Sequence, residues 1–224
     1  MKNIIVFIPA RGGSKGLLNK NIKEFAGEPL IVHTIDYAIK SKMVTEIVVS
    51  TDNGKISEIS RDAGASIIKR PSNISTNIAT TEIAIEHFLN SRVKKPDIIV
   101  LLQATSPLRP KGSLDEALRH FQKGGYDSLL SICPTHRFFW RVKDDNTAYA
   151  EYDYLNRPRR QEMKLEDVRF MENGSLYIFS REHFEKTGNR LGGKIGYVKW
   201  PEDYNIEIDT ITDFKILEGI FLEK

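Results

Sequence analysis

The sequence predicts an α/β protein with a three-layer, mostly parallel sheet, and three observations support this. Short apolar runs alternate with segments of helical periodicity about five times within roughly the first 130 residues. Several of those runs are apolar throughout, as in strands that helices cover on both faces. Polar loops follow the strand ends, where ligands bind in sheets of this kind. We therefore expect right-handed crossovers and a ligand cleft at one edge of the sheet.

The first predicted strand is Ile4–Ile8, an uninterrupted apolar run. It ends at Pro9, because proline has no N–H to donate to a sheet ladder. Helix Pro29–Ser41 follows, with apolar residues at helical spacing and a proline at its start. A second buried strand, Glu46–Ser50, leads to helix Lys55–Ala63, which a glycine stops.

The alternation continues with a third strand, Ser66–Ile68, and with helix Thr81–Asn90, for which Thr80 and Thr81 are the candidate caps. Ile98–Leu102 is the most apolar strand, which favours a central place in the sheet.

In helix Ser113–Phe121, Ser113 and Glu116 have the spacing of a capping box. A fifth strand, Ser128–Ile132, follows it. The later elements are expected to be strands Ser175–Ser180 and Ile195–Trp200, then helix Thr212–Phe221 with Thr212 as its cap.

Residues 134–168 interrupt this rhythm. The stretch contains the basic run Arg157–Arg160 and six aromatic residues: Phe138, Phe139, Trp140, Tyr149, Tyr152 and Tyr154. One interpretation is a solvated surface excursion. The other is an arm that covers a partner subunit, because exposed aromatic patches usually mark interfaces.

Composition limits the classes of protein that remain. The 224 residues, 40% hydrophobic and 28% charged, suit one domain with a full core. A net charge of +3 disfavours a broad nucleic-acid surface. Cys133 is the single cysteine, so neither an intrachain disulfide nor a cysteine zinc site is expected. The apolar runs are too short for a signal peptide or a membrane span, and we expect a cytoplasmic protein.

The loop after the first strand carries Arg11, Gly12, Gly13, Ser14, Lys15, Gly16 and Lys20. Glycines allow positive φ angles and close approach of the backbone, and free N–H groups beside Arg and Lys suit a polyphosphate. The spacing is neither that of a Walker loop nor that of a dinucleotide fingerprint. An ordinary tight turn with solvated charges is the alternative.

Glu207 and Asp209 form the second charged group. In an extended segment, residues two apart point to the same face. Two carboxylates on one face repel each other, and a divalent cation such as Mg²⁺ would relieve that. A polar strand edge without a metal is the alternative.

The motifs together resemble those of a known family. The stretches P-A-R-G-G-S-K-G and L-N-K-N occur near the start, followed in order by Arg70-Pro71, L-L-Q-A-T-S-P-L-R, E-N-G-S-L-Y-I and I-E-I-D-T. This series resembles the CMP-sialic acid synthetases (N-acylneuraminate cytidylyltransferases), which have the sugar-nucleotidyltransferase fold, a Rossmann-like fold. The resemblance implies a homodimer that uses CTP and Mg²⁺ to activate a nonulosonic, sialic-type sugar acid, with release of pyrophosphate.

The resemblance also implies roles for individual residues. Arg11, Lys20 and Asp209 would be catalytic, and Asp209 and Glu207 would bind the metal. The nucleotide would be bound by Ala10, Arg11, Gly12, Gly13, Ser14, Lys20, Asn21, Arg70, Ala79 and Thr81. The sugar would be bound by Gln103, Tyr177, Arg159 and Arg169.

Two of those assignments depend on how this chain differs from the family pattern. In the family, an arm arginine reaches the neighbour's sugar site, and Arg159 is the nearest match. The family often has an arginine shortly before Asn-Gly, where this chain has Met171, and Arg169 is the candidate replacement. Legionaminate, pseudaminate or a 3-deoxy-octulosonate are therefore alternative acceptors. A non-catalytic nucleotide-binding regulator is the alternative from another class.

Overall fold

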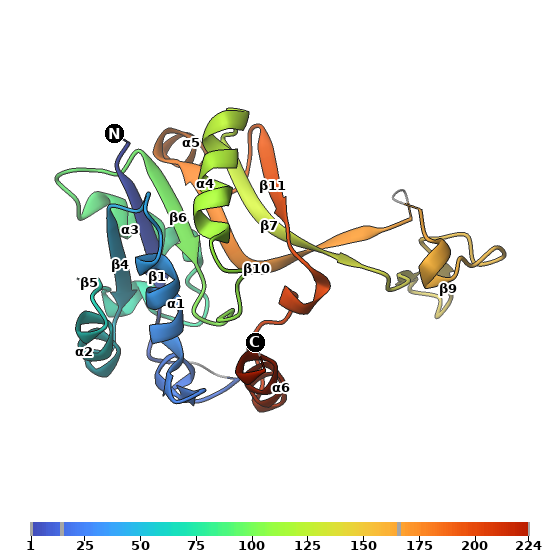
Figure 1. Ribbon diagram of the computed structural model, residues 1–224, viewed down its shortest axis with the longest axis horizontal. Helices are drawn as coiled ribbons and strands as arrows, with labels where there is room; N and C mark the ends of the chain where they lie inside the picture. The colour runs from blue at the N-terminus through green and yellow to red at the C-terminus, as the bar shows by residue number, and fades with distance from the viewer. Residues whose placement is uncertain (1, 14–15, 165–166, 224) are drawn as a thin grey trace.

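The structure, a computed structural model, describes residues 2–13, 16–164 and 167–223. Its main sheet has the strand order β11-β7-β10-β6-β1-β4-β5 (Figure 1). In that order the strands span Ile195–Lys199, Ser128–Thr135, Arg169–Ser180, Ile98–Leu102, Ile4–Pro9, Glu46–Thr51 and Ser66–Lys69. Neighbouring strands are parallel except at β10, which runs antiparallel to β6 and β7. The prediction of a mostly parallel α/β sheet is confirmed.

Helices cover both faces of this sheet. The helices are α1 (Leu30–Ile39), α2 (Gly54–Asp62), α3 (Thr81–Asn90), α4 (Ser113–Gly124), α5 (Arg181–Thr187) and α6 (Ile211–Leu222). One buried cluster joins the sheet to α1, α2 and α4, and a second joins the opposite face to α3 and α5. A third, smaller cluster packs α6 against the start of α1. No helix among the described residues is long and apolar enough to cross a membrane.

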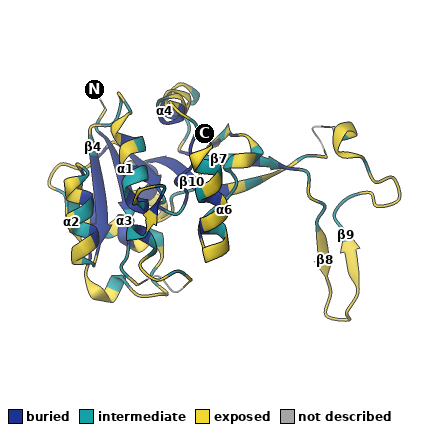
Figure 2. Ribbon diagram, turned by 60° about the horizontal axis from the view of Figure 1, so that its bottom comes forward, coloured by how far each residue is buried: buried dark blue, intermediate teal, exposed yellow. Residues whose placement is uncertain are grey.

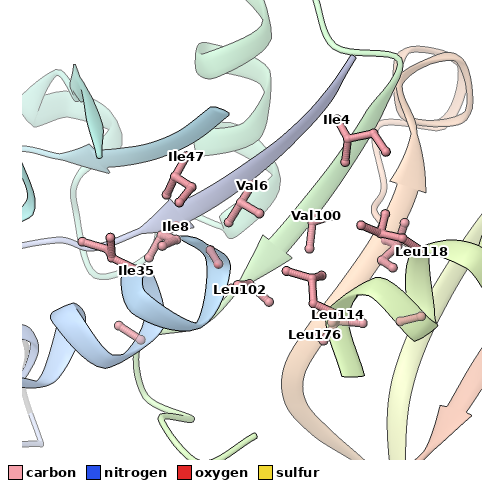
Figure 3. Packing of buried hydrophobic residues seen from close by; sticks show 14 of the residues in the cluster. Ile4, Val6, Ile8, Ile35, Ile47, Val100, Leu102, Leu114, Leu118 and Leu176 are labelled. Atoms are coloured by element: carbon pink, nitrogen blue, oxygen red, sulfur yellow. The ribbon is translucent and has the colours of Figure 1, made fainter. Parts of the chain in front are cut away.

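The first strand shows why an unbroken apolar run was needed. Ile4, Val6 and Ile8 belong to the cluster with α1 and α4 (Figure 3). Ile5 and Phe7 belong to the cluster with α3 on the opposite face. Successive side chains of a strand point to opposite faces, so both sets had to be apolar. Each fully buried side chain of this size contributes about 1.5–3 kcal/mol to stability.

Helix caps differ from two of the predictions. Helix α4 has Gly112 as its N-cap, and the Ser113 hydroxyl donates to Pro110 O (2.7 Å), so the predicted capping box is wrong. Helix α6 is capped by Thr210 rather than Thr212. There the capping box is real, because Asp213 N donates to the Thr210 hydroxyl (3.2 Å) and Thr210 N donates to Asp213 Oδ2 (2.7 Å).

Several element boundaries also differ, and one helix was not predicted. Strand β1 includes Pro9, which lies opposite Ser50 at the last position of the ladder. Strand β10 begins at Arg169, six residues before the predicted start, because it continues to pair with the end of β7. Helix α5 was not predicted, since seven residues are too few to show a helical period. Two-residue strands and short 3-10 helices make up the rest: β2 (Glu24–Phe25), β3 (Glu28–Pro29), η1 (Lys20–Ile22), η2 (Ser72–Ile74) and η4 (Glu202–Tyr204).

The interrupted stretch forms an arm that projects from the globular body (Figure 1). It contains the hairpin β8 (Trp140–Val142) and β9 (Ala148–Ala150), and the short helix η3 (Arg160–Glu162). Its surface is largely exposed (Figure 2), with Trp140 52% and Tyr154 60% accessible. The predicted arm, residues 134–168, overlaps this extension, although residues 134–135 still pair with β10 as the end of β7 and residues 165–166 lie outside the described ones.

Candidate active site

The loops after β1, β4 and β5 meet at one edge of the sheet. Gly12 N donates to Asp52 Oδ1 (2.9 Å), which ties the first loop to the residue after β4. The buried Arg70 guanidinium donates to both the hydroxyl (3.1 Å) and the carbonyl (2.7 Å) of Ser50. Arg11 Nη1 donates to Thr76 O (2.9 Å) in the loop before α3. The expected convergence of polar loops is therefore present.

Two glycines of the first loop, Gly12 and Gly16, allow close packing rather than unusual backbone angles. Neither Gly12 nor Gly13 has a positive φ, contrary to one reason given for them above. A β-carbon on Gly12 would lie 2.8 Å from Asn53 Nδ2, and one on Gly16 would lie 2.5 Å from Asp209 O. The Gly12 N–H is also not free, because Asp52 accepts it. Ser14 and Lys15 lie outside the described residues.

The Lys20 ammonium joins this loop to the acidic segment far along the chain. Lys20 Nζ donates to Ile208 O (2.6 Å) and to Asp209 Oδ1 (3.2 Å). The lysine side chain is 13% exposed, whereas that of Asp209 is 75% exposed. Asp209 therefore exposes most of its carboxylate to solvent, while the mostly buried Lys20 ammonium holds one carboxylate oxygen and the preceding carbonyl of Ile208.

An open pocket of about 330 Å³ surrounds this contact. It is lined by Pro9, Arg11, Gly16, Lys20, Asn21, Thr105 and Asp209. Asn21 Nδ2 donates to Arg11 O (3.0 Å), and Ile208 N donates to Thr105 O (2.9 Å). Residues from both ends of the chain thus share one pocket.

Glu207 lies beside Asp209, although the structure assigns no strand to their segment. Burial, then the nearby Asp209 carboxylate, raises the pKa of Glu207 to about 7, and the Lys20 ammonium opposes the shift. Among the described residues, no group of three or more His, Cys, Asp or Glu side chains is arranged to hold a metal ion. A cation here would have these two carboxylates and would need further ligands from substrate or water.

The residues expected on the sugar side are only partly accessible. Gln103 follows β6 and is partly exposed, but Tyr177 is 2% exposed. The Tyr177 hydroxyl donates to the Glu172 carboxylate, and the Arg190 guanidinium lies 4.6 Å from the centre of its ring. Glu172, which is exposed, is thus the group that Tyr177 holds in place.

The two remaining sugar-side arginines do not join this site within the chain. Arg159 is exposed on the arm, where it caps η3. Arg169 is paired with Glu151 of the arm, and its guanidinium lies 5.4 Å from the ring centre of Phe139. The suggestion that Arg169 replaces an arginine beside Asn-Gly is therefore not supported by its position. On the nucleotide side, Ala79 and Thr81 flank Thr80, whose hydroxyl caps α3.

Sequence reasoning missed Arg109, the last residue of the A-T-S-P-L-R stretch. Its guanidinium is buried and donates to Thr34 Oγ1 (3.1 Å), Gln103 O (2.7 Å) and Ser175 O (3.2 Å). Burial lowers the pKa of Arg109 to about 10. Arg109 thus fastens the Gln103 loop to β10, and a lone arginine in a loop carried no periodic signal by which to find it.

Comparison with known proteins defines the family. A family model described as cytidylyltransferase matches residues 5–219. The chain belongs to the cytidylyltransferase family. An N-acylneuraminate cytidylyltransferase of Oncorhynchus mykiss is 36% identical over 223 residues, and one of Streptococcus agalactiae serotype III (strain NEM316) is 31% identical over 215 residues. These matches cover 97% and 94% of this chain but 50% and 51% of the relatives, so the chain spans about half their length.

Solved structures share the fold of this chain. A CMP:2-keto-3-deoxy-manno-octonic acid synthetase complexed with CTP has a TM-score of 0.74 at 15% identity, covering 99% of both chains. The 4-diphosphocytidyl-2C-methyl-D-erythritol synthase of Anaerococcus prevotii DSM 20548 has a TM-score of 0.68 at 16% identity, covering 100% of this chain and 99% of that one. At these identities the likeness concerns the fold.

The raised pKa of Glu207 predicts a pH-dependent cost in the metal-free protein. The unfolded chain ionises this carboxyl near its ordinary pKa of 4.5, whereas the folded chain does so near 7, so stability falls as pH rises through that window. Glu207→Gln should therefore raise Tm at pH 8, measured by calorimetry with a chelator present. The gain should shrink towards pH 5.

Glu58→Gln, at an exposed position on α2, is the control and should show no such pH dependence. A gain for Glu207→Gln that stays constant from pH 5 to 8, or a loss of stability at pH 8, would contradict the assigned environment.

The contact between Gly16 and Asp209 predicts a second outcome. Gly16→Ala forces either the loop or the main chain at Asp209 to move, and overpacking of this kind costs about 1–3 kcal/mol. Urea unfolding should show that loss. Gly13→Ala is the matched control, since no atom lies within 4 Å of its β-carbon position. Equal stability of the two variants would show that the close approach does not constrain the loop.

Proposed function

We propose that this chain transfers the cytidylyl group of CTP to a sialic-type sugar acid, forming the CMP-sugar and pyrophosphate. The observation that carries the proposal is the shared pocket in which Lys20 holds Asp209 beside Arg11. The printed names of the relatives supply the nucleotide and the acceptor class. In this reaction a hydroxyl oxygen of the acceptor attacks the α-phosphorus, and the bond to the leaving pyrophosphate breaks.

Positively charged side chains and the alignment of the two substrates would provide most of the rate acceleration. Arg11 and Lys20 bring positive charge to the pocket where the triphosphate would bind, and negative charge grows on its oxygens during transfer. Asn21 fixes the backbone of Arg11, so the loop presents that charge from a defined position. Transfers of this kind depend chiefly on alignment and charge stabilisation.

Asp209 and Glu207 fit a bound Mg²⁺. Oxygen ligands from one or two carboxylates, completed by water and substrate phosphates, are what this ion takes. Burial and, second, the Asp209 carboxylate raise the pKa of Glu207, and a bound cation would offset both effects by stabilising the ionised carboxylate. When bound, Mg²⁺ would neutralise phosphate charge as a Lewis acid. Asp209, which is more exposed, is the stronger candidate ligand.

On the remaining surfaces we assign the nucleoside to the Arg70 and Ala79–Thr81 side and the sugar to the Gln103 and Glu172 side. Tyr177 would then act through Glu172, because its hydroxyl is already donated to that carboxylate. A carboxylate and an amide are suitable partners for a polyhydroxylated acid.

We also propose that the arm pairs two copies into a homodimer. The support is the group of exposed aromatic side chains on the arm, because exposed apolar patches usually mark interaction surfaces. Arg159 would then reach the sugar site of the other copy. The cytoplasm, where CTP is available, is the expected location.

Pyrophosphate release with CTP across a panel of acids tests the acceptor. N-acetylneuraminate, legionaminate, pseudaminate and 3-deoxy-octulosonate should differ in kcat/KM, with N-acetylneuraminate highest if the relatives' names apply to this chain. The other acids are included because this chain has Met171 where the family often has an arginine. Higher kcat/KM for another acid would correct the acceptor, and no turnover with any acid would favour a nucleotide-binding regulator.

Removing the Lys20 side chain should affect binding of CTP much more than binding of the acid. Lys20→Ala should raise KM for CTP roughly tenfold or more while changing KM for the acid little, because a charge-assisted hydrogen bond contributes about 1.5–3 kcal/mol. Lys55→Ala, on the exposed start of α2, is the control. An unchanged dependence on CTP would remove Lys20 from the triphosphate site.

A further inference from the structure

Strand β10 is interrupted where it passes the acidic segment. Its pairing with β7 changes register between Glu172 and Tyr177. Within that interval Gly174 has a φ of 63°, in the left-handed region. An irregularity of this kind is a β-bulge, which bends a strand and redirects its neighbours beside functional sites.

The Glu207 carboxylate occupies the place that a side chain at position 174 would take. A β-carbon on Gly174 would lie 1.3 Å from Glu207 Oε1 and 2.4 Å from its Cδ. The two groups cannot occupy that space together. The atoms that would have to move are at the end of a flexible side chain, so the carboxylate rather than the backbone would be displaced.

The neighbouring Asn173 fixes both sides of this contact. Its amide Nδ2 donates to Tyr204 O (3.1 Å), three residues before Glu207. Its Oδ1 accepts from Ser131 Oγ (2.5 Å) and from Ser175 N (3.3 Å). With Asn173 buried, the bulge and the chain leading to Glu207 are held to each other.

Among the residues that the structure describes, no hydrogen bond or ion pair accounts for where the Glu207 carboxylate lies. It is only partly exposed and lies near two further carboxylates, Asp209 and Glu172, and near the Lys20 ammonium, which attracts it without forming an ion pair. A carboxylate without donors is placed by the space available to it, and Gly174 provides that space.

We propose that Gly174 is a positioning residue: its missing side chain places the Glu207 carboxylate beside Asp209, and thereby sets the affinity of the site for a divalent cation. This proposal rests on the proposed function, because it assumes that Glu207 and Asp209 together bind the cation. It goes beyond it by assigning a role to a residue that touches neither nucleotide nor metal.

The test compares two glycines with the same backbone angle. Gly188 has a φ of 69° and no atom within 4 Å of its β-carbon position. Gly174→Ala and Gly188→Ala therefore carry the same cost of a left-handed alanine, and only the first meets Glu207. Mn²⁺ binding, followed by electron paramagnetic resonance with α,β-methylene CTP present, is the readout. We expect at least tenfold weaker binding for Gly174→Ala and less than twofold change for Gly188→Ala.

A shorter acid at position 207 should relieve the conflict. In the Glu207→Asp background, adding Gly174→Ala should weaken Mn²⁺ binding by less than about threefold, because a side chain one methylene shorter draws its carboxylate back from the position of the new methyl group. Equal effects of Gly174→Ala in both backgrounds, or Gly174→Ala behaving like Gly188→Ala, would overturn the proposal.

Metal-free crystal structures of wild type and Gly174→Ala separate this proposal from the proposed function. If the Glu207 carboxylate of Gly174→Ala is displaced and the backbone is not, the structures support the proposal that Gly174 positions this carboxylate. An unmoved carboxylate would overturn it. Wild-type protein that binds no Mn²⁺ and shows no turnover would instead overturn the proposed function and the cation-affinity part of this proposal, whatever the crystals show of the carboxylate.

Discussion

The contact between Lys20 and the Ile208–Asp209 main chain is the constraint on which the site depends. The donor and the acceptor are 188 positions apart, and each needs the other. The ammonium is largely removed from water, which is costly unless it meets a negative partner. The acidic segment has no strand or helix of its own to hold it, so the lysine, the Thr105 carbonyl and the close approach of Gly16 define its path.

The antiparallel strand β10 supports this arrangement from the other side. It lies between β6 and β7, where its bulge faces the acidic segment and where Arg109 ties Ser175 to the Gln103 loop. The same strand continues out of the sheet into the arm. One element therefore touches the predicted metal carboxylates, the predicted sugar side and the surface through which two copies would pair.

Positive and negative side chains lie on opposite sides of the site, and this separation favours a charged ligand. Arg11, Lys20 and Arg70 lie on the loop side, and Glu207, Asp209 and Glu172 lie opposite. Only Lys20 and Asp209 form an ion pair among these described residues. An anion on the first side and a cation on the second would complete both sets, which is what a nucleoside triphosphate with a divalent ion brings.

Most of the strands and helices, the mostly parallel sheet and the loops that carry the site were predictable from the sequence, whereas helix α5 and the antiparallel direction of β10 were not. Apolar periodicity is a local property, and Ile4–Pro9, Ile98–Leu102 and Thr81–Asn90 show it clearly. The pairing of Lys20 with Asp209, the burial of Tyr177 against Glu172, the clamp made by Arg109 and the space that Gly174 leaves for Glu207 were decided only by the tertiary structure. These are contacts between segments distant in sequence, and they depend on how helices and strands pack rather than on any repeat that a single segment displays.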